Sequence, residues 1–242
     1  MSIIKINNLE KQFPVGDGFF TALSDINMEV KKGEFAGLIG PSGSGKTTLL
    51  NIIGSLDTPT KGTAEVMGKS IAELTYKQSA GLRNRHIGFI FQTYNLLPVY
   101  TVFENVEFSL LLQKMSAVER KKAVMQALKW VGLTDKVYSK PSMLSGGECQ
   151  RVAIARAMVK RPEIVLADEP TANLDSENSH HILKTMKKLN KELGVTFVFS
   201  THDEKVMQYL DRIIALEDGK VLRDETQEEF VVRKNSQIYK TK

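Results

Sequence analysis

A run of nine residues near the N-terminus has the composition of a polyphosphate-binding loop. The run consists of Gly40, Pro41, Ser42, Gly43, Ser44, Gly45, Lys46, Thr47 and Thr48. Glycines allow a backbone to wrap around phosphate groups with its N–H groups pointing inward, and Lys46 adds a positive charge. The hydroxyl of Thr47 would lie where a Mg²⁺ ion shared with the phosphates binds. Apolar residues flank the run on both sides. They favour a strand, a loop and a helix over a glycine-rich turn without chemical importance.

Two adjacent carboxylates, Asp168 and Glu169, follow an apolar run over residues 164–167. Such a run is typical of a buried strand, so the acids stand at its carboxyl end, where ligands of open parallel sheets gather. Asp168 could hold Mg²⁺ through water, and Glu169 could take a proton from an attacking water molecule. The alternative, a solvated surface pair, is disfavoured because the preceding run is too apolar for a surface strand.

Gln92 and His202 also follow apolar runs, at residues 87–91 and 195–201. A polar side chain at a strand's carboxyl end is better placed for chemistry than one in mid-strand. His202 could donate a hydrogen bond to a terminal phosphate or to the attacking water. Each residue alone is weak evidence. Together with Lys46 and the two acids, they indicate a site built on the ends of several strands.

Ser145, Gly146 and Gly147 open a helix that the sequence predicts to run to about residue 160. Ser145 is a good N-cap, and the glycines leave the helix N-terminus accessible, so this is a second position suited to an anion. The alternative is an ordinary capped helix. Two phosphate-binding helix ends in one small chain are hard to aim at a single nucleotide unless two copies of the chain face each other.

Phe13 could offer a flat ring to a purine, because stacking requires only a π face near the phosphate loop. It lies in a predicted antiparallel hairpin with strands at residues 3–9 and 22–30 and turn residues at 16–18. From these residues alone, a core or hairpin aromatic is an equally good interpretation.

Further elements are predicted around these residues. A strand at residues 63–67 and a polar helix at residues 72–85 follow the phosphate-loop helix. A helix with an apolar stripe follows the turn Asn173-Leu174-Asp175 and ends at Gly194.

Residues 94–141 differ in character from the rest of the chain. They predict helices at residues 103–114 and 116–131 with no strand between them, which indicates a helical subdomain inserted in an α/β core. The apolar stretch at residues 96–100 is expected to be partly exposed, where it could contact a protein partner.

Composition narrows the class of protein. The chain has 242 residues, 42% of them hydrophobic, which suffices for one large α/β domain or a core with a smaller subdomain. No run approaches the roughly eighteen apolar residues of a membrane span, and the N-terminus lacks the pattern of a secretory signal. The single cysteine, Cys149, agrees with a reducing, cytoplasmic compartment. The net charge of +5 is too diffuse to indicate nucleic-acid binding.

The order and spacing of these motifs resemble those of the ATP-binding cassette (ABC) ATPases over nearly the whole chain. The specific part is the signature motif Leu144-Ser145-Gly146-Gly147, since many NTPases share the phosphate loop. Within the family, the chain looks like the branch that serves lipoprotein release, macrolide efflux and the cell-division permease complex.

Two positions depart from the commonest pattern of the family. Phe13 replaces the usual adenine-stacking tyrosine, and Glu148 replaces a glutamine. Neither change should abolish the use of ATP, because Phe13 keeps the π face and Glu148 lies beyond the residues expected to touch phosphate.

The resemblance implies an α/β fold with a P-loop NTPase core, a mostly parallel sheet, an antiparallel β subdomain and an inserted helical subdomain. On this view residues 1–93 and 142–225 form the core with the β subdomain, and residues 94–141 form the helical subdomain. Residues 226–242 form a polar tail, and the chain from about residue 223 is expected to be partly disordered.

The resemblance also implies a head-to-tail homodimer that forms on ATP binding and encloses two ATP molecules with Mg²⁺. Such a pair is related by two-fold symmetry. In each site, one chain would supply Phe13, the phosphate loop, Gln92, Asp168, Glu169 and His202. The other chain would supply Ser145, Gly146 and Gly147, and Asp175 is also expected at the nucleotide. Thr47, Gln92 and Asp168 would hold the metal, and Glu169 would act as the base with His202 and Gln92 beside it.

Three functional classes remain. We expect the ATPase subunit of a transporter or mechanotransmitter, working with an integral membrane permease subunit at the cytoplasmic face of the inner membrane and without a direct nucleic-acid partner. A non-transport ABC ATPase that acts on DNA or ribosomes usually carries a long coiled coil or two cassettes in one chain, and neither is present. A regulatory module that binds ATP without hydrolysing it is disfavoured by Glu169 and His202.

Overall fold

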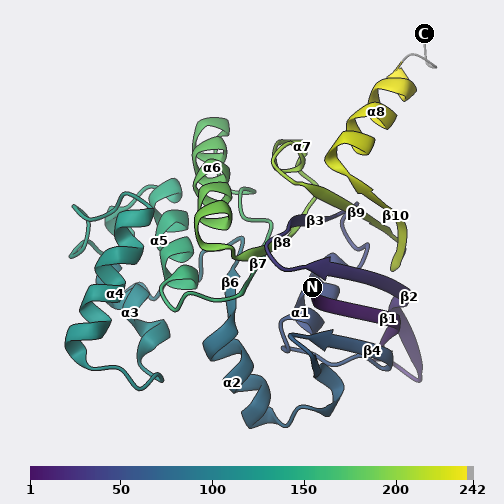
Figure 1. Ribbon diagram of the computed structural model, residues 1–242, viewed down its shortest axis with the longest axis horizontal. Coiled ribbons are helices and arrows are strands. Elements are labelled where there is room, and N and C mark those ends of the chain that lie inside the picture. Colours follow the sequence, from purple (N-terminus) through teal and green to yellow (C-terminus); the bar gives the residue numbers. More distant parts are fainter. Residues whose placement is uncertain (239–242) are drawn as a thin grey trace. The chain divides into compact units, whose positions relative to one another are not determined.

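The chain folds into two compact units that both mix helices and strands (Figure 1). The structure is a computed structural model that describes residues 1–238. Unit 1 contains residues 1–74 and the chain from residue 198 onward, and unit 2 contains residues 75–197. The bounds predicted for the core and for the helical subdomain differ from this division and stay a prediction. None of the described helices is both long and apolar enough to cross a lipid bilayer.

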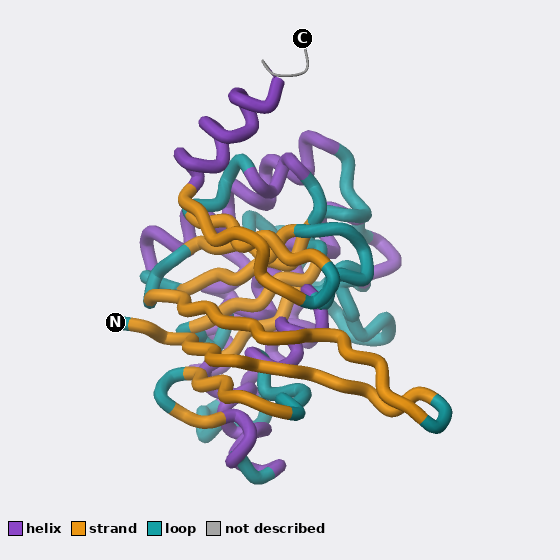
Figure 2. The backbone as a smooth tube through the Cα atoms, turned by 90° about the vertical axis from the view of Figure 1, so that its right-hand side faces the viewer, coloured by secondary structure: helices purple, strands orange, loops and turns teal. Residues whose placement is uncertain are grey.

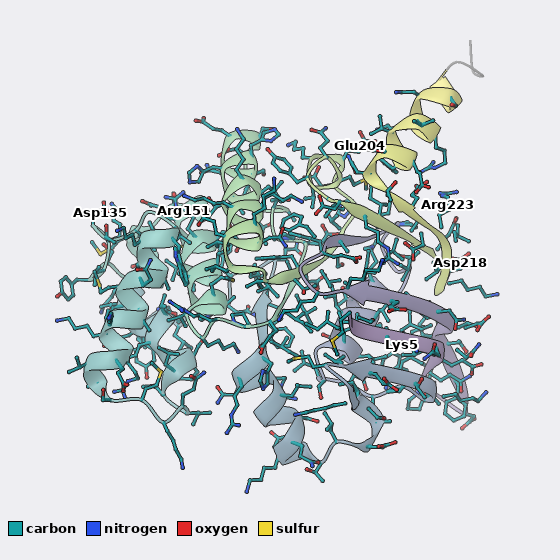
Figure 3. All side chains as sticks on the ribbon, viewed as in Figure 1. Lys5, Asp135, Arg151, Glu204, Asp218 and Arg223 are labelled. Carbon is teal, nitrogen blue, oxygen red and sulfur yellow. The ribbon has the colours of Figure 1, made fainter. Side chains whose placement is uncertain are left out.

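Unit 1 contains an antiparallel sheet in the strand order β2-β1-β4-β5. The strands β1 (Ser2–Val15) and β2 (Gly18–Lys31) form a hairpin that is longer than predicted, and Figure 2 shows it as two long strands joined by a tight turn. β4 (Lys61–Val66) confirms the strand predicted at residues 63–67, and β5 (Lys69–Ser70) is a short addition. Ile4 and Ile6 are buried while Lys5 between them is exposed, which is the two-residue period of a half-buried strand. Figure 3 labels Lys5 on this sheet.

Unit 1 also contains the strand that leads into the phosphate loop. This strand, β3 (Phe35–Ile39), runs parallel to β9 (Arg212–Glu217), which pairs antiparallel with β10 (Lys220–Thr226). β8 (Thr196–Thr201) lies next to β3 in the strand order, and the rings of Phe35 and Phe199 pack with 4.6 Å between their centroids. All of β3 is buried, as expected of a strand covered on both faces. The helices α1 (Lys46–Ile53) and α7 (Glu204–Met207) follow β3 and β8.

Unit 2 begins with a helix and two parallel strands. The polar helix predicted from residue 72 instead starts at Tyr76, as α2 (Tyr76–His86), after the short 3-10 helix η1 (Ile71–Glu73) of unit 1. The reason is that Thr75 and Gln78 form a capping box, in which each side chain accepts from the other's backbone N–H. β6 (Ile87–Ile90) then runs parallel to β7 (Ile164–Asp168).

The remaining helices of unit 2 confirm one of the two helices predicted in residues 94–141 and correct the other. α4 (Ala117–Trp130) is the helix predicted from Ser116, whose side chain caps it. The single helix predicted at residues 103–114 is wrong: α3 (Val102–Glu107) continues only as the 3-10 helix η2 (Phe108–Leu110). Leu111 and Leu112 that follow are 52% and 85% exposed, so little burial of apolar surface supports a further helical turn.

Two longer helices of unit 2 follow the 3-10 helix η3 (Pro141–Met143). They are α5 (Gly146–Met158) and α6 (Ser176–Leu193), and both agree with the predicted helices. α6 ends at Gly194 in the left-handed conformation, as predicted.

Residues 223–238 form regular secondary structure, whereas partial disorder was predicted from about residue 223. β10 continues to Thr226, and α8 (Gln227–Ile238) follows it. An ion pair fixes the helix to the strand, with 2.7 Å between Arg233 Nη2 and Glu225 Oε1. The part of the predicted tail at residues 239–242 lies outside the described residues.

Candidate nucleotide-binding site

The phosphate loop connects β3 to α1 in unit 1, as the sequence predicted. Gly45 is the N-cap of α1 in the left-handed conformation, with a φ of 95° and no side-chain hydrogen bond that caps the helix. The N–H groups of a first helical turn lack intrahelical partners and attract anions. The loop therefore ends at a helix N-terminus without a side-chain cap.

Close packing explains two of the glycines in the loop. Gly40 has a φ of 152°, and a Cβ atom there would lie 2.0 Å from the carbonyl oxygen of Leu216. At Gly45 a Cβ atom would lie 2.8 Å from the carbonyl oxygen of Ala22. Backbone atoms cannot give way as a flexible side chain can, so both positions require glycine. Around Gly43, in contrast, nothing lies within 4 Å of the Cβ position, so the middle of the loop borders open space.

Two side chains of the loop, those of Lys46 and Ser44, carry groups that suit a phosphate ligand. The ammonium group of Lys46 donates to the carbonyl oxygens of Gly40 at 2.9 Å and Pro41 at 2.8 Å, so the charge lies against the loop. Ser44 is 2% exposed, and its Oγ has no hydrogen-bond partner among the described residues. A buried hydroxyl without a partner is costly, and a bound phosphate oxygen would provide an acceptor. These groups fit a phosphate ligand.

The other predicted site residues of unit 1 lie on its surface or close to it. Thr47 is exposed and Thr48 is half-buried at the start of α1. His202 is exposed directly after β8 and precedes Asp203, which caps α7 by accepting from Lys205 N at 2.8 Å.

Phe13 is a surface residue of the hairpin, opposite Phe20 on β2. Its exposed fraction of 37% argues against the core alternative. The ammonium group of Lys11 lies 4.9 Å from the centroid of the Phe13 ring and pairs with Asp57 at 2.5 Å. One face of the ring therefore has a cation beside it, and enough of the ring is accessible for a ligand to stack on it.

In unit 2, Asp168 and Glu169 leave the sheet at the same edge as Gln92. Ile90 is opposite Ala167 in the parallel pair, so the residues that follow each strand start side by side. Gln92 lies two residues beyond the end of β6 and is exposed. Glu169 has a φ of 45°, a left-handed conformation that is costly for a residue with a Cβ atom. Such backbone strain is frequent at functional sites, which agrees with the predicted role of this carboxylate.

The signature motif forms a capped helix start. Ser145 Oγ accepts from Glu148 N at 3.2 Å, and the Glu148 carboxylate accepts from Ser145 N at 2.8 Å. The latter bond is the main cause that lowers the pKa of Glu148. Glu148, the departure from the commonest pattern of the family, thus has a structural role in this capping box.

The start of α5 lies against the start of α6. A Cβ atom at Gly147 would lie 2.4 Å from Asn178 Oδ1, and the Asn178 amide donates to Asp175 Oδ2 at 2.7 Å. Asp175 is the N-cap of α6, and the hydrogen bond from Asn178 N is the main cause that lowers its pKa. The glycine therefore permits the contact that joins the signature motif to the turn at Asp175.

Several side chains donate hydrogen bonds to the backbone around the site, and the sequence did not predict them. Arg156 of α5 donates to the carbonyl oxygens of Tyr94 and Asn95, and the side-chain amide of Asn173 donates to the carbonyl oxygen of Gln92. Gln150 of α5 donates to the carbonyl oxygen of Pro170 at 2.6 Å. One signal could have identified Arg156: it is a single cation within the apolar run at residues 152–159.

The structure groups the predicted site residues by unit. Unit 1 holds the phosphate loop, Phe13 and His202. Unit 2 holds Gln92, the two acids, the signature motif and Asp175.

Comparisons with known proteins identify the family of the chain. The ABC transporter family matches residues 23–172. The chain is 45% identical to "ABC transporter H family member 2" of Dictyostelium discoideum over 99% of the chain, and it spans 47% of that relative's length. It is 43% identical to the "Lipoprotein-releasing system ATP-binding protein LolD" of Pseudoalteromonas translucida, covering 93% of the chain and 97% of the relative.

A solved structure extends the comparison to three dimensions. It is the "Dimeric structure of a post-hydrolysis state of the ATP-binding cassette MJ0796 bound to ADP and Pi". The TM-score is 0.85 at 43% sequence identity, covering 93% of this chain and 98% of that one. The predicted P-loop fold of mixed α/β sheets is thereby confirmed. The chain belongs to the ABC transporter family as an ATPase domain, and its similar relatives include an ATPase of the lipoprotein-releasing branch.

Proposed function

We propose that this chain binds and hydrolyses ATP as a homodimer whose closure acts on a separate integral membrane permease. The observation that carries the proposal is the phosphate loop, in which Lys46 lies against the loop carbonyls and α1 begins without a side-chain cap. In this proposal the loop from Gly40 to Thr48 holds the phosphates of ATP, and Phe13 stacks on the adenine.

Hydrolysis requires a base and charge neutralisation. Glu169 would accept a proton from a water molecule as the water oxygen attacks the terminal phosphorus of ATP. The bond from that phosphorus to the bridging oxygen breaks, which yields ADP and inorganic phosphate. His202 would donate to the terminal phosphate, and Gln92 would orient the water.

The residues present also suit Mg²⁺, which prefers oxygen ligands and keeps several waters. The hydroxyl of Thr47, the side-chain oxygen of Gln92 and the carboxylate of Asp168, through water, would hold the ion. When bound, the ion would offset negative charge on the phosphate oxygens.

The signature motif would act on the ATP bound to the second copy of the chain. Ser145, Gly146 and Gly147 begin a helix, and helix starts suit anions. Asp175, which is joined to this helix start through Asn178, would lie beside the same nucleotide. Two solved structures of the similar cassette MJ0796 are dimers, one of them with ADP and phosphate, which supports this arrangement.

We further propose a position at the cytoplasmic face of the inner membrane. The relative named for lipoprotein release supports a lipoprotein or lipid substrate, and a relative named for macrolide export supports a drug-like substrate. Mechanotransmission is the other role that the proposal includes. The stretch at residues 96–100, in which Val99 is 71% exposed and Tyr100 is 40% exposed, would contribute to the contact with the permease. The alternative of an ATPase that acts on DNA or ribosomes finds no support among the relatives described above.

Two measurements test the proposal. The purified chain should hydrolyse ATP only with Mg²⁺, and Glu169→Gln should lower the rate by roughly 10² to 10⁴ while ATP binding persists, the usual contribution of a positioned base. If Glu169→Gln hydrolyses ATP at the wild-type rate, Glu169 is not the base. Purification in detergent should recover an integral membrane protein with the chain, and its identity would name the permease.

A further inference from the structure

A half-buried guanidinium group holds the backbone just after Gln92. Arg156 lies on α5, and its Nη1 and Nη2 atoms donate to the carbonyl oxygens of Asn95 at 2.5 Å and Tyr94 at 2.6 Å. Burial lowers the pKa of Arg156, which means that removing the cation from water is costly. The two charge-assisted hydrogen bonds offset part of that cost. A group held in this way specifies the shape of the backbone that it contacts.

The backbone that Arg156 contacts has an unfavourable conformation. Tyr94 and Asn95 are consecutive non-glycine residues with φ values of 59° and 48°. Left-handed residues of this kind persist only where the surroundings fix them. Here the surroundings include the fork of Arg156 and a bond from Thr93 Oγ1 to Asn95 Oδ1 at 2.9 Å.

The same loop contacts the other end of α5. A Cβ atom at Gly146 would lie 3.0 Å from the phenolic oxygen of Tyr94. Tyr94 therefore contacts the signature motif through its side chain and Arg156 through its carbonyl oxygen. All of these residues belong to unit 2.

We propose that Arg156 is a positioning residue for Gln92. By holding the carbonyls of Tyr94 and Asn95, it fixes the path of the backbone that carries Gln92. Because Arg156 lies on α5, the helix that Ser145 caps, it also joins this backbone to the helix of the signature motif. The inference rests on the proposed function, in which Gln92 is a Mg²⁺ ligand beside the attacking water. In this proposal Arg156 itself contacts neither ATP nor the metal.

A double-mutant cycle tests this role with the Mg²⁺ concentration that half-saturates ATP hydrolysis as its readout. Arg156→Gln should raise that concentration about 10- to 100-fold, the usual effect of losing a partner that orients a metal ligand. ATP affinity without Mg²⁺ should not change. Gln92→Ala should raise the same concentration, and adding Arg156→Gln to Gln92→Ala should have little further effect, because residues that act as one unit are not additive.

Lys160→Met is the matched control. Lys160 is another half-buried cation, just after the end of α5, and its ammonium group donates to the carbonyl oxygen of Arg83 at 2.7 Å and not to the loop after Gln92. Its loss should leave the Mg²⁺ dependence unchanged. Arg156→Lys provides a second variant in case Arg156→Gln does not fold. Lysine carries one compact ammonium in place of the fork, so an intermediate shift is expected.

The outcomes separate the inference from the proposed function. If Gln92→Ala has no effect on the Mg²⁺ dependence, the proposed role of Gln92 fails and the inference fails with it. Suppose instead that Gln92→Ala raises the half-saturating Mg²⁺ concentration and that the double variant raises it further, by the full factor seen for Arg156→Gln alone. Arg156 then acts independently of Gln92, and only the inference is overturned. An unchanged Mg²⁺ dependence in folded Arg156→Gln and Arg156→Lys also overturns it.

Discussion

The side-chain amide of Asn173 donates a hydrogen bond to the backbone carbonyl of Gln92, with 3.0 Å between the two atoms. Asn173 belongs to the turn that leads into α6, and Gln92 belongs to the loop that follows β6. The bond joins the segments that carry two predicted site residues, Gln92 and Asp175. It was not foreseen from the sequence, because the partners are 81 positions apart.

Asn173→Ala should affect activity more than stability. The Gln92 carbonyl lies at an exposed position, so water can replace the lost donor and the free energy of unfolding should fall by no more than about 1 kcal/mol. The kcat of ATP hydrolysis should fall about tenfold, because the backbone of Gln92 loses an orienting partner. Asn7→Ala is the control, since it removes an exposed hydrogen bond that the side-chain amide of Asn7 donates to the hydroxyl of Thr63 in unit 1. Equal losses of kcat in both variants would contradict a special role for Asn173.

Lys46→Ala should weaken nucleotide binding, and Thr47→Ala should mainly change the Mg²⁺ dependence. Lys46 carries the charge that lies against the loop, and a hydrogen bond to a charged group contributes about 1.5 to 3 kcal/mol. The Kd for ATP should therefore rise roughly 10- to 100-fold in calorimetry. Lys5→Ala, on an exposed position of β1, serves as the control. Unchanged affinity in Lys46→Ala would count against the phosphate-loop interpretation.

Local pattern was sufficient to predict much of the fold. The apolar run before Gly40 and the Lys46 that opens a helix predicted β3, the loop and α1 in the right order, because strand and helix periods are properties of short segments. Ser116 and Ser145 were recognised as caps for the same reason. The early end of α3 was not predicted, because it depends on how little of Leu111 and Leu112 the fold buries.

The contacts that support the site were beyond local pattern. Arg156 and Gln150 both donate to backbone carbonyls far along the chain, and nothing in the sequence marks a carbonyl as an acceptor for a particular side chain. The left-handed conformation of Glu169 could not be predicted either, since a residue with a Cβ atom carries no local signal for a positive φ. Local pattern thus indicates candidates for chemistry more readily than it indicates the residues that orient them.

Phe13→Ala should weaken ATP binding less than Lys46→Ala does. The ring is accessible, and an aromatic stack contributes about 1 kcal/mol, which corresponds to roughly a fivefold change in Kd. Phe13→Tyr should bind as the wild type does, because it keeps the π face. The matched control is Phe19→Ala, on the same hairpin with 73% of its surface exposed. If both alanine variants lose the same affinity, Phe13 is a hairpin surface residue and does not stack on adenine.

Lys160 should make stability depend on pH in alkaline solution. Burial lowers its pKa from 10.5 to about 8, so between these values the unfolded chain binds more protons than the folded one. Stability should therefore rise with pH across this window, by roughly 3 kcal/mol relative to Lys160→Met. Urea unfolding followed by the fluorescence of Trp130, the only tryptophan, measures the difference at each pH. A constant difference between pH 7 and 10.5 would contradict the lowered pKa.

Ser145→Arg should bind ATP yet fail to dimerise or turn over, because Ser145 and Lys46 would belong to different chains in each composite site. The phosphate loop of the variant remains whole, and its ATP affinity should match the wild type in calorimetry. Ser142→Arg is a nearby control, since Ser142 is exposed just before the signature motif. Normal hydrolysis by Ser145→Arg as a monomer in light scattering would exclude the head-to-tail dimer.

Mixing Ser145→Arg with Lys46→Ala chains gives the sharper form of this test. A head-to-tail mixed dimer has one site with both defects and one site with neither, because each chain gives its phosphate loop to one site and its signature motif to the other. If one intact site is enough for turnover, the mixture should regain activity that neither variant shows alone. If both sites must act together, activity stays absent, but ATP should still drive the mixed pair together through its one good site. A mixture that neither regains activity nor associates with ATP would mean that Ser145 and Lys46 serve the same chain's nucleotide.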